Sequence, residues 1–425
     1  MQKLLTWIDD RFPLTALWES QWGKYVAPKN FNFWYYFGSL AAFVLVLQIV
    51  TGIFLTMNYK PDAAKAFESV EYIMRDVEWG WLIRYMHSTG ASMFFIVVYL
   101  HMFRGLMYGS YRKPRELTWI LGVLIYLTLM AEAFFGYLLP WGQMSYWGAQ
   151  VIVNLFSTVP LIGEELGVWI RGDYTISDIT LNRFFAFHVI AVPLVLLALV
   201  AAHLMALHET GSSNPDGVEI KKQPKDPATG LPLDGIYSHP YYTVKDIVGV
   251  IFFLAVFSVI MFFLPDMGGY FLESNNFIPA DPLKTPEHIA PVWYFTPYYA
   301  MLRAVPSFLD SQFWGVIVMA GAVLIFFFLP WLDRGRVKSI RYRGILYKSW
   351  LAAFVIAFVI LGYLGVVPVT VWGQFAEQVP VLGGADRATV LARVLTIVYF
   401  LFFLLMPWYT RRDRTKPEPD RVRMR

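Results

Sequence analysis

Four of the seven histidines lie in two long apolar stretches, two in each, and histidines of this kind could hold metal centres. His101 follows His87 by fourteen positions, and His203 follows His188 by fifteen positions. On an α-helix these intervals bring both histidines of a stretch to roughly one face, about 21 Å and about 22 Å apart along the axis. A single intramembrane histidine could equally be a packing residue or part of a proton relay. Because the two intervals are nearly equal, His87 can lie level with His188, and His101 with His203. Two such level pairs instead favour two stacked haems, each with two axial histidines.

Glycines at the same interval support this prediction. Gly52 follows Gly38 by fourteen positions in another apolar stretch, and Gly136 follows Gly122 by the same interval. A flat macrocycle between helices needs positions without a side chain, which glycine supplies. Packing of small residues between helices is the alternative interpretation.

Arginines flank the histidine pairs at the expected membrane edges. They are Arg84, Arg104 and Arg183. Guanidinium groups bind carboxylates well, so these arginines suit haem propionates. Ordinary snorkelling of a long cationic side chain to the interface is the alternative explanation.

The composition predicts an all-α integral membrane protein that would position these residues. Of 425 residues, 57% are hydrophobic and 16% charged, against about 45–50% and about 25% in soluble domains. A helix needs about 20 apolar residues to cross the hydrocarbon layer. Eight stretches qualify, and the first four would form a dihaem four-helix bundle. They are residues 38–57, 82–108, 117–139, 181–208, 247–264, 313–332, 350–367 and 390–408.

The absence of cysteine and the small net charge exclude several functions. Without cysteine the chain cannot form disulfides, hold a thiolate-ligated iron–sulfur cluster or attach haem covalently. A net charge of +4 gives no electrostatic support for nucleic-acid binding.

The distribution of lysine and arginine predicts the topology. The N-terminal segment, the connections at 109–116, 209–244 and 333–348 and the C-terminal tail together hold 23 of these residues, and the alternate connections hold seven. Basic connections stay on the cytoplasmic side. Both termini are therefore expected in the cytoplasm, if the chain resides in a bacterial inner membrane.

This topology divides the chain into five segments. Residues 1–35 would be a cytoplasmic interfacial segment, and residues 36–210 the dihaem bundle with outer-side loop helices at 140–180. A cytoplasmic loop would follow at 211–244. Residues 245–410 would hold four further spans and a long loop at 265–312, and residues 411–425 a basic cytoplasmic tail.

Nearly the whole chain resembles the cytochrome b family, the dihaem membrane subunit of the quinol:cytochrome c oxidoreductase in its full-length bacterial form. Four motifs carry the resemblance: GYLLPWGQMSYWGAQVI at 136–152, RFFAFHVI at 183–190, HETGSSNP at 208–215 and PVWYFTPYYAMLR at 291–303. The resemblance implies two non-covalent b haems, with His87 and His188 on an outer low-potential haem. It implies His101 and His203 on an inner high-potential haem.

The resemblance also implies an enzyme activity and partners. Quinol would be oxidised at an outer site, with one electron passing to a Rieske iron–sulfur subunit and on to a cytochrome c-type subunit. The other electron would cross both haems to quinone at an inner site, coupled to proton translocation. A homodimeric complex is expected by the same analogy.

Family analogy assigns residues to both quinone sites. The outer site would contain Phe134, Tyr137, Met144, Gly148, Ile152, Pro291, Tyr294 and Tyr299. The inner site would contain His208, Ser212, Lys245 and Asp246. A histidine, an acid and a lysine around an apolar pocket suit proton delivery to a quinone, although a solvated helix end with a Lys–Asp pair would look similar.

Two features depart from the family pattern. The second histidine interval is one position longer than the more usual fourteen, which a slight helix irregularity could absorb. The motif PVWY at 291–294 replaces the usual PEWY, so Val292 stands where a carboxylate is expected. The nearest acid in that loop is Glu287, and we hypothesise that it accepts the quinol proton instead. A solvated loop acid is the alternative.

Two other functions fit parts of the pattern. A dihaem anchor of another respiratory dehydrogenase would share the histidine pairs, but it would have fewer spans and lack the 136–152 and 291–303 motifs. A proton-coupled secondary transporter could use intramembrane histidines as a relay, but an internal repeat would be expected and none is found.

Overall fold

The computed structural model describes residues 2–306, 311–379 and 382–424 and is almost entirely helical. Within these residues, eight helices are long and apolar enough to cross a membrane, which confirms the predicted number. They are Phe33–Thr56, Gly80–Tyr108, Glu116–Leu138, Asp178–Thr210, Tyr241–Phe263, Phe313–Leu332, Ile345–Val366 and Arg387–Leu404. Several begin a few residues before the predicted spans, because interfacial aromatic residues such as Tyr241 and Tyr242 continue the helix beyond the apolar stretch.

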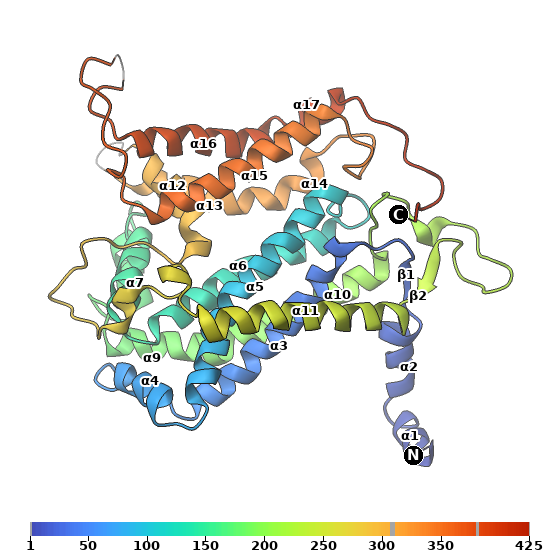
Figure 1. The fold of residues 1–425 in the computed structure, drawn as a ribbon, viewed down its shortest axis with the longest axis horizontal. Coiled ribbons are helices and arrows are strands. Elements are labelled where there is room, and N and C mark those ends of the chain that lie inside the picture. Colours follow the sequence, from blue (N-terminus) through green and yellow to red (C-terminus); the bar gives the residue numbers. More distant parts are fainter. Residues whose placement is uncertain (1, 307–310, 380–381, 425) are drawn as a thin grey trace.

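Figure 1 shows the order of the elements along the chain. The first half contains α1 (Gln2–Asp9), α2 (Leu14–Trp18), β1 (Val26–Pro28), α3 (Tyr36–Thr56), α4 (Ala66–Arg75), α5 (Gly80–Tyr108), α6 (Glu116–Leu138), α7 (Gln143–Phe156), α8 (Gly163–Arg171), α9 (Asp178–Ala186) and α10 (Val192–Thr210). The second half contains β2 (Gly235–Tyr237), α11 (Tyr241–Phe263), α12 (Thr296–Ala304), α13 (Phe313–Leu324), α14 (Leu329–Leu332), α15 (Ile345–Val366), α16 (Arg387–Leu404) and α17 (Met406–Arg412).

The spans form two groups. In the first, α3 packs along α5 and α6 packs along α10, while α11 lies against α3 and α5. In the second, α15 packs against α12 and α16, and this layer runs along the top of Figure 1. The helix α5 is the most buried of the spans. The first group therefore supplies the interior in which the histidine pairs lie.

Glycine residues end both histidine-bearing helices. α5 stops at Gly109, whose φ is 59°, and α10 stops at Gly211, whose φ is 78°. Glycine adopts this left-handed conformation without the steric penalty of a Cβ atom. The chain can therefore turn sharply where each helix leaves the membrane.

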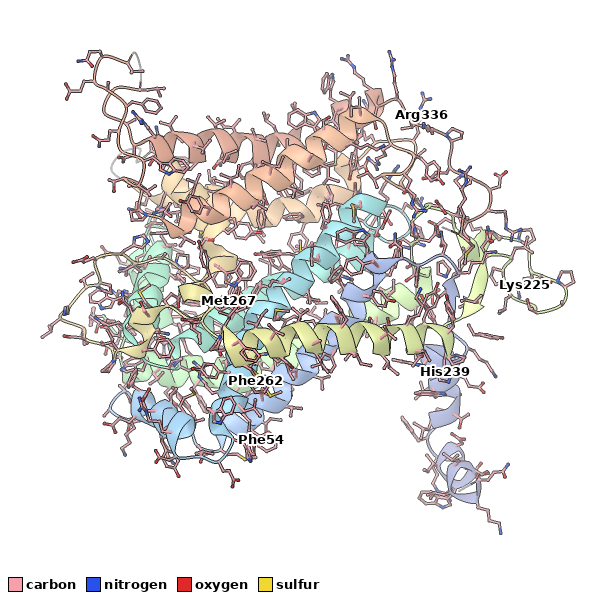
Figure 2. The ribbon with its side chains drawn as sticks, in the orientation of Figure 1. Phe54, Lys225, His239, Phe262, Met267 and Arg336 are labelled. Carbon is pink, nitrogen blue, oxygen red and sulfur yellow. The ribbon has the colours of Figure 1, made fainter. Side chains whose placement is uncertain are left out.

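The five lysine- and arginine-rich segments meet at one end of the bundle, as the predicted topology requires. β1 pairs with β2 in an antiparallel two-stranded ribbon that joins the N-terminal segment to the 209–244 connection, and the sequence did not predict these strands. Figure 2 places Lys225, His239 and Arg336 toward this end and Met267 at the opposite end of α11.

Buried carboxylates bind these segments together. Asp234 is fully buried and pairs with Lys29 of the N-terminal segment and Arg421 of the tail. Asp216 accepts from Arg341 at 2.9 Å and from the main-chain N–H of Arg423 at 2.8 Å. A carboxylate removed from water is stable only when charge-assisted hydrogen bonds compensate for lost hydration. These contacts therefore require the N-terminal segment, the loop and the tail to fold together.

Glu219 has the same role for the connection between α5 and α6. Its carboxylate accepts two hydrogen bonds from Arg115, at 2.7 and 2.9 Å, and one from Lys338. Burial by itself raises the pKa of Glu219, but the hydrogen bonds and charges of Arg115 and Lys338 outweigh this effect and lower the pKa to about 2. The ionised carboxylate is thus strongly favoured in the folded state.

We expect Glu219→Gln to lower the thermal stability of the detergent-solubilised protein at pH 7 by about 2 kcal/mol, since it leaves the buried Arg115 without its carboxylate. Because the folded pKa is depressed, the stabilisation is present above the unfolded pKa and is lost as the pH falls from about 4.5 to about 2. The variant should lose less stability than the wild type in that window. The exposed Glu209→Gln is the matched control. Equal acid sensitivity of Glu219→Gln and the wild type would contradict the assignment.

Candidate functional site

The structure brings the four intramembrane histidines together in the two predicted pairs. The imidazole of His87 on α5 faces that of His188, with ring centroids 6.1 Å apart. The imidazole of His101 faces that of His203 on α10, with ring centroids 6.4 Å apart. Residues from separate helices thus form two histidine pairs, one toward each end of α5.

A π-helical turn accommodates the additional residue in the second histidine interval. This turn, Phe187–Ala191, lies between α9 and α10 and contains His188. A π-helical turn holds one residue more than an α-helical turn. It therefore returns His188 to the same face as His203, which confirms that a helix irregularity absorbs the longer interval.

Each predicted glycine lies against one of these imidazoles. A Cβ atom at Gly38 would lie 3.3 Å from the His101 ring, and one at Gly52 would lie 3.3 Å from the His87 ring. At Gly122 the corresponding distance to His203 is 3.4 Å. A Cβ atom at Gly136 would approach the His188 ring more closely than real Cβ atoms ever do. The immediate effect of the glycines is therefore to make room for the histidine rings of the adjacent helix.

Hydrogen bonds at Nδ1 orient the two rings of the outer pair. The Thr51 hydroxyl donates to the main-chain oxygen of Leu47 at 2.7 Å, so it accepts the Nδ1 proton of His87 at 2.9 Å. The Nδ1 atom of His188 lies 3.0 Å from the main-chain oxygen of Glu132. A proton held at Nδ1 leaves the Nε2 lone pair free, which is the arrangement a metal-binding histidine needs.

A cavity of about 280 Å³ surrounds the outer pair. Its lining includes Gly52 from α3, Gly136 from α6 and Arg84, as well as both histidines. The cavity extends to the loop between α11 and α12, where Val292 and Tyr294 also line it. Residues predicted for a haem and residues predicted for a quinol site therefore share one apolar space.

The three predicted arginines lie in different environments. Arg84 lines the cavity. The guanidinium of Arg104 lies over the Tyr35 ring at 4.9 Å, and its Nε is buried without a hydrogen-bond partner among the described residues. Arg183 is exposed and donates to the main-chain oxygen of Trp169 at 2.6 Å, and it is not one of the cavity-lining residues.

Tyr137 joins the cavity to a carboxylate that the sequence did not point to. Tyr137 lines the cavity and its hydroxyl donates to Glu273 Oε2 at 2.7 Å. Burial raises the pKa of the Glu273 carboxyl to about 7, and the hydrogen bond from Tyr137 offsets this effect only in part. Glu273 lies 19 positions before Val292, so its proximity to Tyr137 depends on the path of the loop and carried no spacing signal.

Most other residues predicted for the outer site do not line the cavity. A Cβ atom at Gly148 would make ordinary contact with the Tyr137 ring at 3.6 Å. Tyr294 is buried and stacks on Phe95, with centroids 3.9 Å apart. The remaining predicted residues are not among the cavity-lining residues: Phe134, Met144, Ile152, Pro291 and Tyr299.

Glu287 does not reach the cavity, as it would have to in order to replace the missing acid at Val292. Its side chain is exposed, and it is not among the cavity-lining residues. The proline-bounded loop turns Glu287 outward, whereas Val292 is buried and lines the cavity. In the same loop, Glu273 contacts Tyr137 of the cavity wall.

The residues predicted for the inner site lie beside the N-terminal segment. His208 stacks on Tyr25, with ring centroids 4.3 Å apart, and its Nδ1 donates to Gln21 Oε1 at 2.6 Å. The main-chain N–H of Ser212 donates to the same tyrosine hydroxyl at 3.2 Å. Neither Gln21 nor Tyr25 was predicted, because α2 and the turn after it carry no motif that points to His208.

Asp246 and Lys245 lie at the start of α11, where they contact different neighbours. Asp246 accepts a hydrogen bond from the Ser39 hydroxyl at 3.0 Å, next to Gly38. Lys245 lies over the rings of Tyr241 and Tyr242 at 5.5 and 5.4 Å. Ser39 therefore links the predicted acid to the helix that supports His101.

Two family models match the chain. The model described as Cytochrome b/b6/petB matches residues 22–211, and the one described as Cytochrome b(C-terminal)/b6/petD matches residues 279–382. The two matched segments contain all four intramembrane histidines and the PVWY motif.

Characterised proteins are similar over the same length. The "Cytochrome b" of Allochromatium vinosum is 62% identical over 420 residues, which is 98% of both chains. The "Cytochrome b" of Rhodospirillum rubrum is 47% identical over 98% of this chain and 95% of its own. A solved chain titled "Hyperthermophilic respiratory Complex III" superposes with a TM-score of 0.83 at 38% identity, covering 96% of this chain and 99% of that chain. The chain therefore belongs to the cytochrome b family of haem b-binding integral membrane proteins.

Proposed function

We propose that the chain is the electron-transferring, quinone-binding subunit of a quinol:cytochrome c oxidoreductase of the Complex III type. The observation that supports this most strongly is the pair of facing histidines at each end of α5. Two imidazoles that would hold one metal between them, with metal–nitrogen distances of about 2 Å, need ring centroids about 6 Å apart. Centroid distances of 6.1 and 6.4 Å fit this requirement.

We assign His87 and His188 to an outer haem b and His101 and His203 to an inner one. When bound, the two haems would supply one-electron transfer across the membrane. The residues of this chain hold the imidazole planes, through Thr51 and Glu132 at the outer pair and through glycine contacts at both pairs. The cavity beside the outer pair provides space between the helices.

Arg84 and Arg104 are the arginines that we assign to haem propionates. Both are half-buried on the helix that carries His87 and His101, and the Nε atom of Arg104 is buried without a hydrogen-bond partner among the described residues. An unpaired guanidinium away from water is costly, and a carboxylate on a bound group would compensate it. Arg183 is bound to Trp169 at the surface, so we do not assign it this role.

Quinol oxidation would take place where the cavity reaches Tyr137 and Tyr294. A quinol must lose two protons, so an apolar site needs a group that accepts one near neutral pH. The Tyr137 hydroxyl lies between the cavity and the Glu273 carboxylate. A proton released in the cavity can therefore pass through this hydroxyl to Glu273, whose pKa of about 7 suits the task. This acid replaces Glu287 in our proposal.

Quinone reduction would take place near His208 and Asp246. Both are titratable groups at the end of the bundle where the lysine- and arginine-rich segments gather. Tyr25 and Ser39 hold them through a ring stack and a hydrogen bond. A quinone that gains electrons needs protons, and these two side chains are placed to supply them.

The proposal includes partner chains because this chain has no cysteine. An iron–sulfur cluster and a covalently attached c-type haem must then be carried by a Rieske subunit and a cytochrome c-type subunit. We also propose a homodimeric complex in a bacterial inner membrane with both termini in the cytoplasm. The clustering of basic segments at one end of the bundle supports this orientation.

Single substitution of the histidines tests the haem assignment. Replacing His101 or His203 should remove the inner haem and leave part of the outer one, and replacing His87 or His188 should have the opposite effect. Reduced-minus-oxidised spectra and pyridine haemochrome content of the purified complex measure both haems. Two haems per chain in all four variants would refute the assignment.

The glycine contacts predict a difference between two matched substitutions on α6. Gly136→Ala would force the His188 ring to move and should abolish or strongly reduce the outer haem. Gly122→Ala places a methyl group 3.4 Å from His203, a contact that a small shift relieves, so the inner haem should be largely retained. Spectra of the two variants provide the test. A larger loss of the inner haem in Gly122→Ala would contradict the structural account.

The proposed proton acceptor predicts both a rate loss and a changed pH profile. Glu273 accepts a proton only when ionised, so wild-type quinol oxidation should rise as the pH increases through about 7. Glu273→Gln should lower the rate about 100-fold and remove this rise, with haem content unchanged. Glu287→Gln is the matched control and should oxidise quinol normally. Full activity of Glu273→Gln, or a loss confined to Glu287→Gln, would rule out Glu273 as the acceptor.

A further inference from the structure

We infer that Glu132 is a positioning residue for His188, and that its carboxylate lowers the reduction potential of the outer haem relative to the inner one. This inference rests on the proposed function for the presence of haem at His87 and His188. Glu132 lies within α6 near the outer end of that span. Acids inside a membrane span are costly and usually functional.

The carboxylate of Glu132 lies directly at His188. Its Oε1 atom is 3.0 Å from His188 Nδ1, and the main-chain oxygen of the same residue is also 3.0 Å from that nitrogen. Both side chains are largely buried, with exposed fractions of 17% for Glu132 and 18% for His188. The Nδ1 atom therefore hydrogen-bonds to the main-chain oxygen of Glu132 with the carboxylate of the same residue beside it, which leaves Nε2 free for a metal.

Among the four histidines, within the part of the chain that the structure describes, this contact is specific to His188. The Nδ1 atom of His87 is bonded to the neutral Thr51 hydroxyl. No described carboxyl group lies at the Nδ1 atom of His101 or His203, and the hydrogen-bonding group at His203 is the neutral backbone of Thr118. The outer pair thus has a carboxyl group beside one ligand, whereas no described carboxyl group lies beside either ligand of the inner pair.

The second carboxylate oxygen supports a role toward a bound group rather than a closed structural contact. Glu132 Oε2 is buried without a hydrogen-bond partner among the described residues. Glu132 lines the same cavity as Gly136 and Arg84. A carboxylate that serves only packing would be expected to satisfy both oxygens.

A carboxylate placed at the N–H group of a metal-bound imidazole makes that imidazole a stronger electron donor. Stronger donation and the nearby negative charge both stabilise the oxidised metal, so the reduction potential falls. This effect would act on the outer haem alone. It would therefore increase the driving force for electron transfer from the outer haem to the inner one.

Redox titration of both haems in the purified complex tests this inference with Glu132→Gln, which keeps the shape and removes the charge. We expect the midpoint potential of the outer haem to rise by at least about 59 mV, which is a tenfold change in the equilibrium constant for one-electron reduction. The inner haem should keep its wild-type midpoint. Thr51→Val, which removes a neutral partner from the other ligand of the same haem, should produce a much smaller shift.

An unchanged outer midpoint in Glu132→Gln with both haems present would overturn the inference and leave the haem assignment intact. If Glu132→Gln loses the outer haem, Glu132→Asp decides the question because it retains the charge. A bound outer haem with a near wild-type midpoint in Glu132→Asp supports the inference, and its loss or a raised midpoint overturns it. Wild-type protein without a second haem would instead refute the proposed function, whatever Glu132 does.

Discussion

Imidazole rings face each other in two pairs in the interior of the first helical group, and most of this structure depends on that constraint. Each ring must point inward, keep one nitrogen free and fit against a helix that passes close by. Glycine on the neighbouring helix lets the ring fit closely, since a Cβ atom there would contact the ring. The π-helical turn at Phe187–Ala191 directs the His188 ring inward, because it returns His188 to the face of His203.

Polar groups in the interior of a membrane protein need partners within the protein, and the two ends of this molecule satisfy that need differently. At the end with the strand ribbon, the buried carboxylate of Asp234 and the half-buried carboxylate of Glu219 bind arginine and lysine from several separate segments. At the opposite end, Glu132 bonds a histidine and Glu273 bonds a tyrosine. Carboxylates held by several arginines and lysines join separate segments of the fold, whereas carboxylates beside a histidine or a tyrosine are candidates for chemistry.

This asymmetry gives the proposed outer half two acids with separate tasks. Glu273 would take a proton from the substrate through Tyr137, and Glu132 would act on the haem through His188. Neither lies in the position where the family motif normally has its acid, because Val292 occupies that place and is buried in the cavity wall. The chemistry of the site therefore depends on side chains that approach the cavity from α6 and from the loop after α11.

The sequence by itself determined the class of protein, the eight spans and the histidine pairs, because helical periodicity and hydrophobic length are local properties that a single chain displays directly. The two glycine pairs repeat the fourteen-position interval of His87 and His101. Only the packing of α3 on α5 and of α6 on α10 showed that each glycine faces an imidazole. The acid near the outer cavity was predicted from proximity along the chain, and the loop instead turns Glu287 outward and brings Glu273 to Tyr137. Likewise, the contacts of Glu132 with His188 and of Tyr25 with His208 join residues that lie far apart in the sequence. Contacts of that kind are set by tertiary packing, since no local pattern records which side chains the fold will bring together.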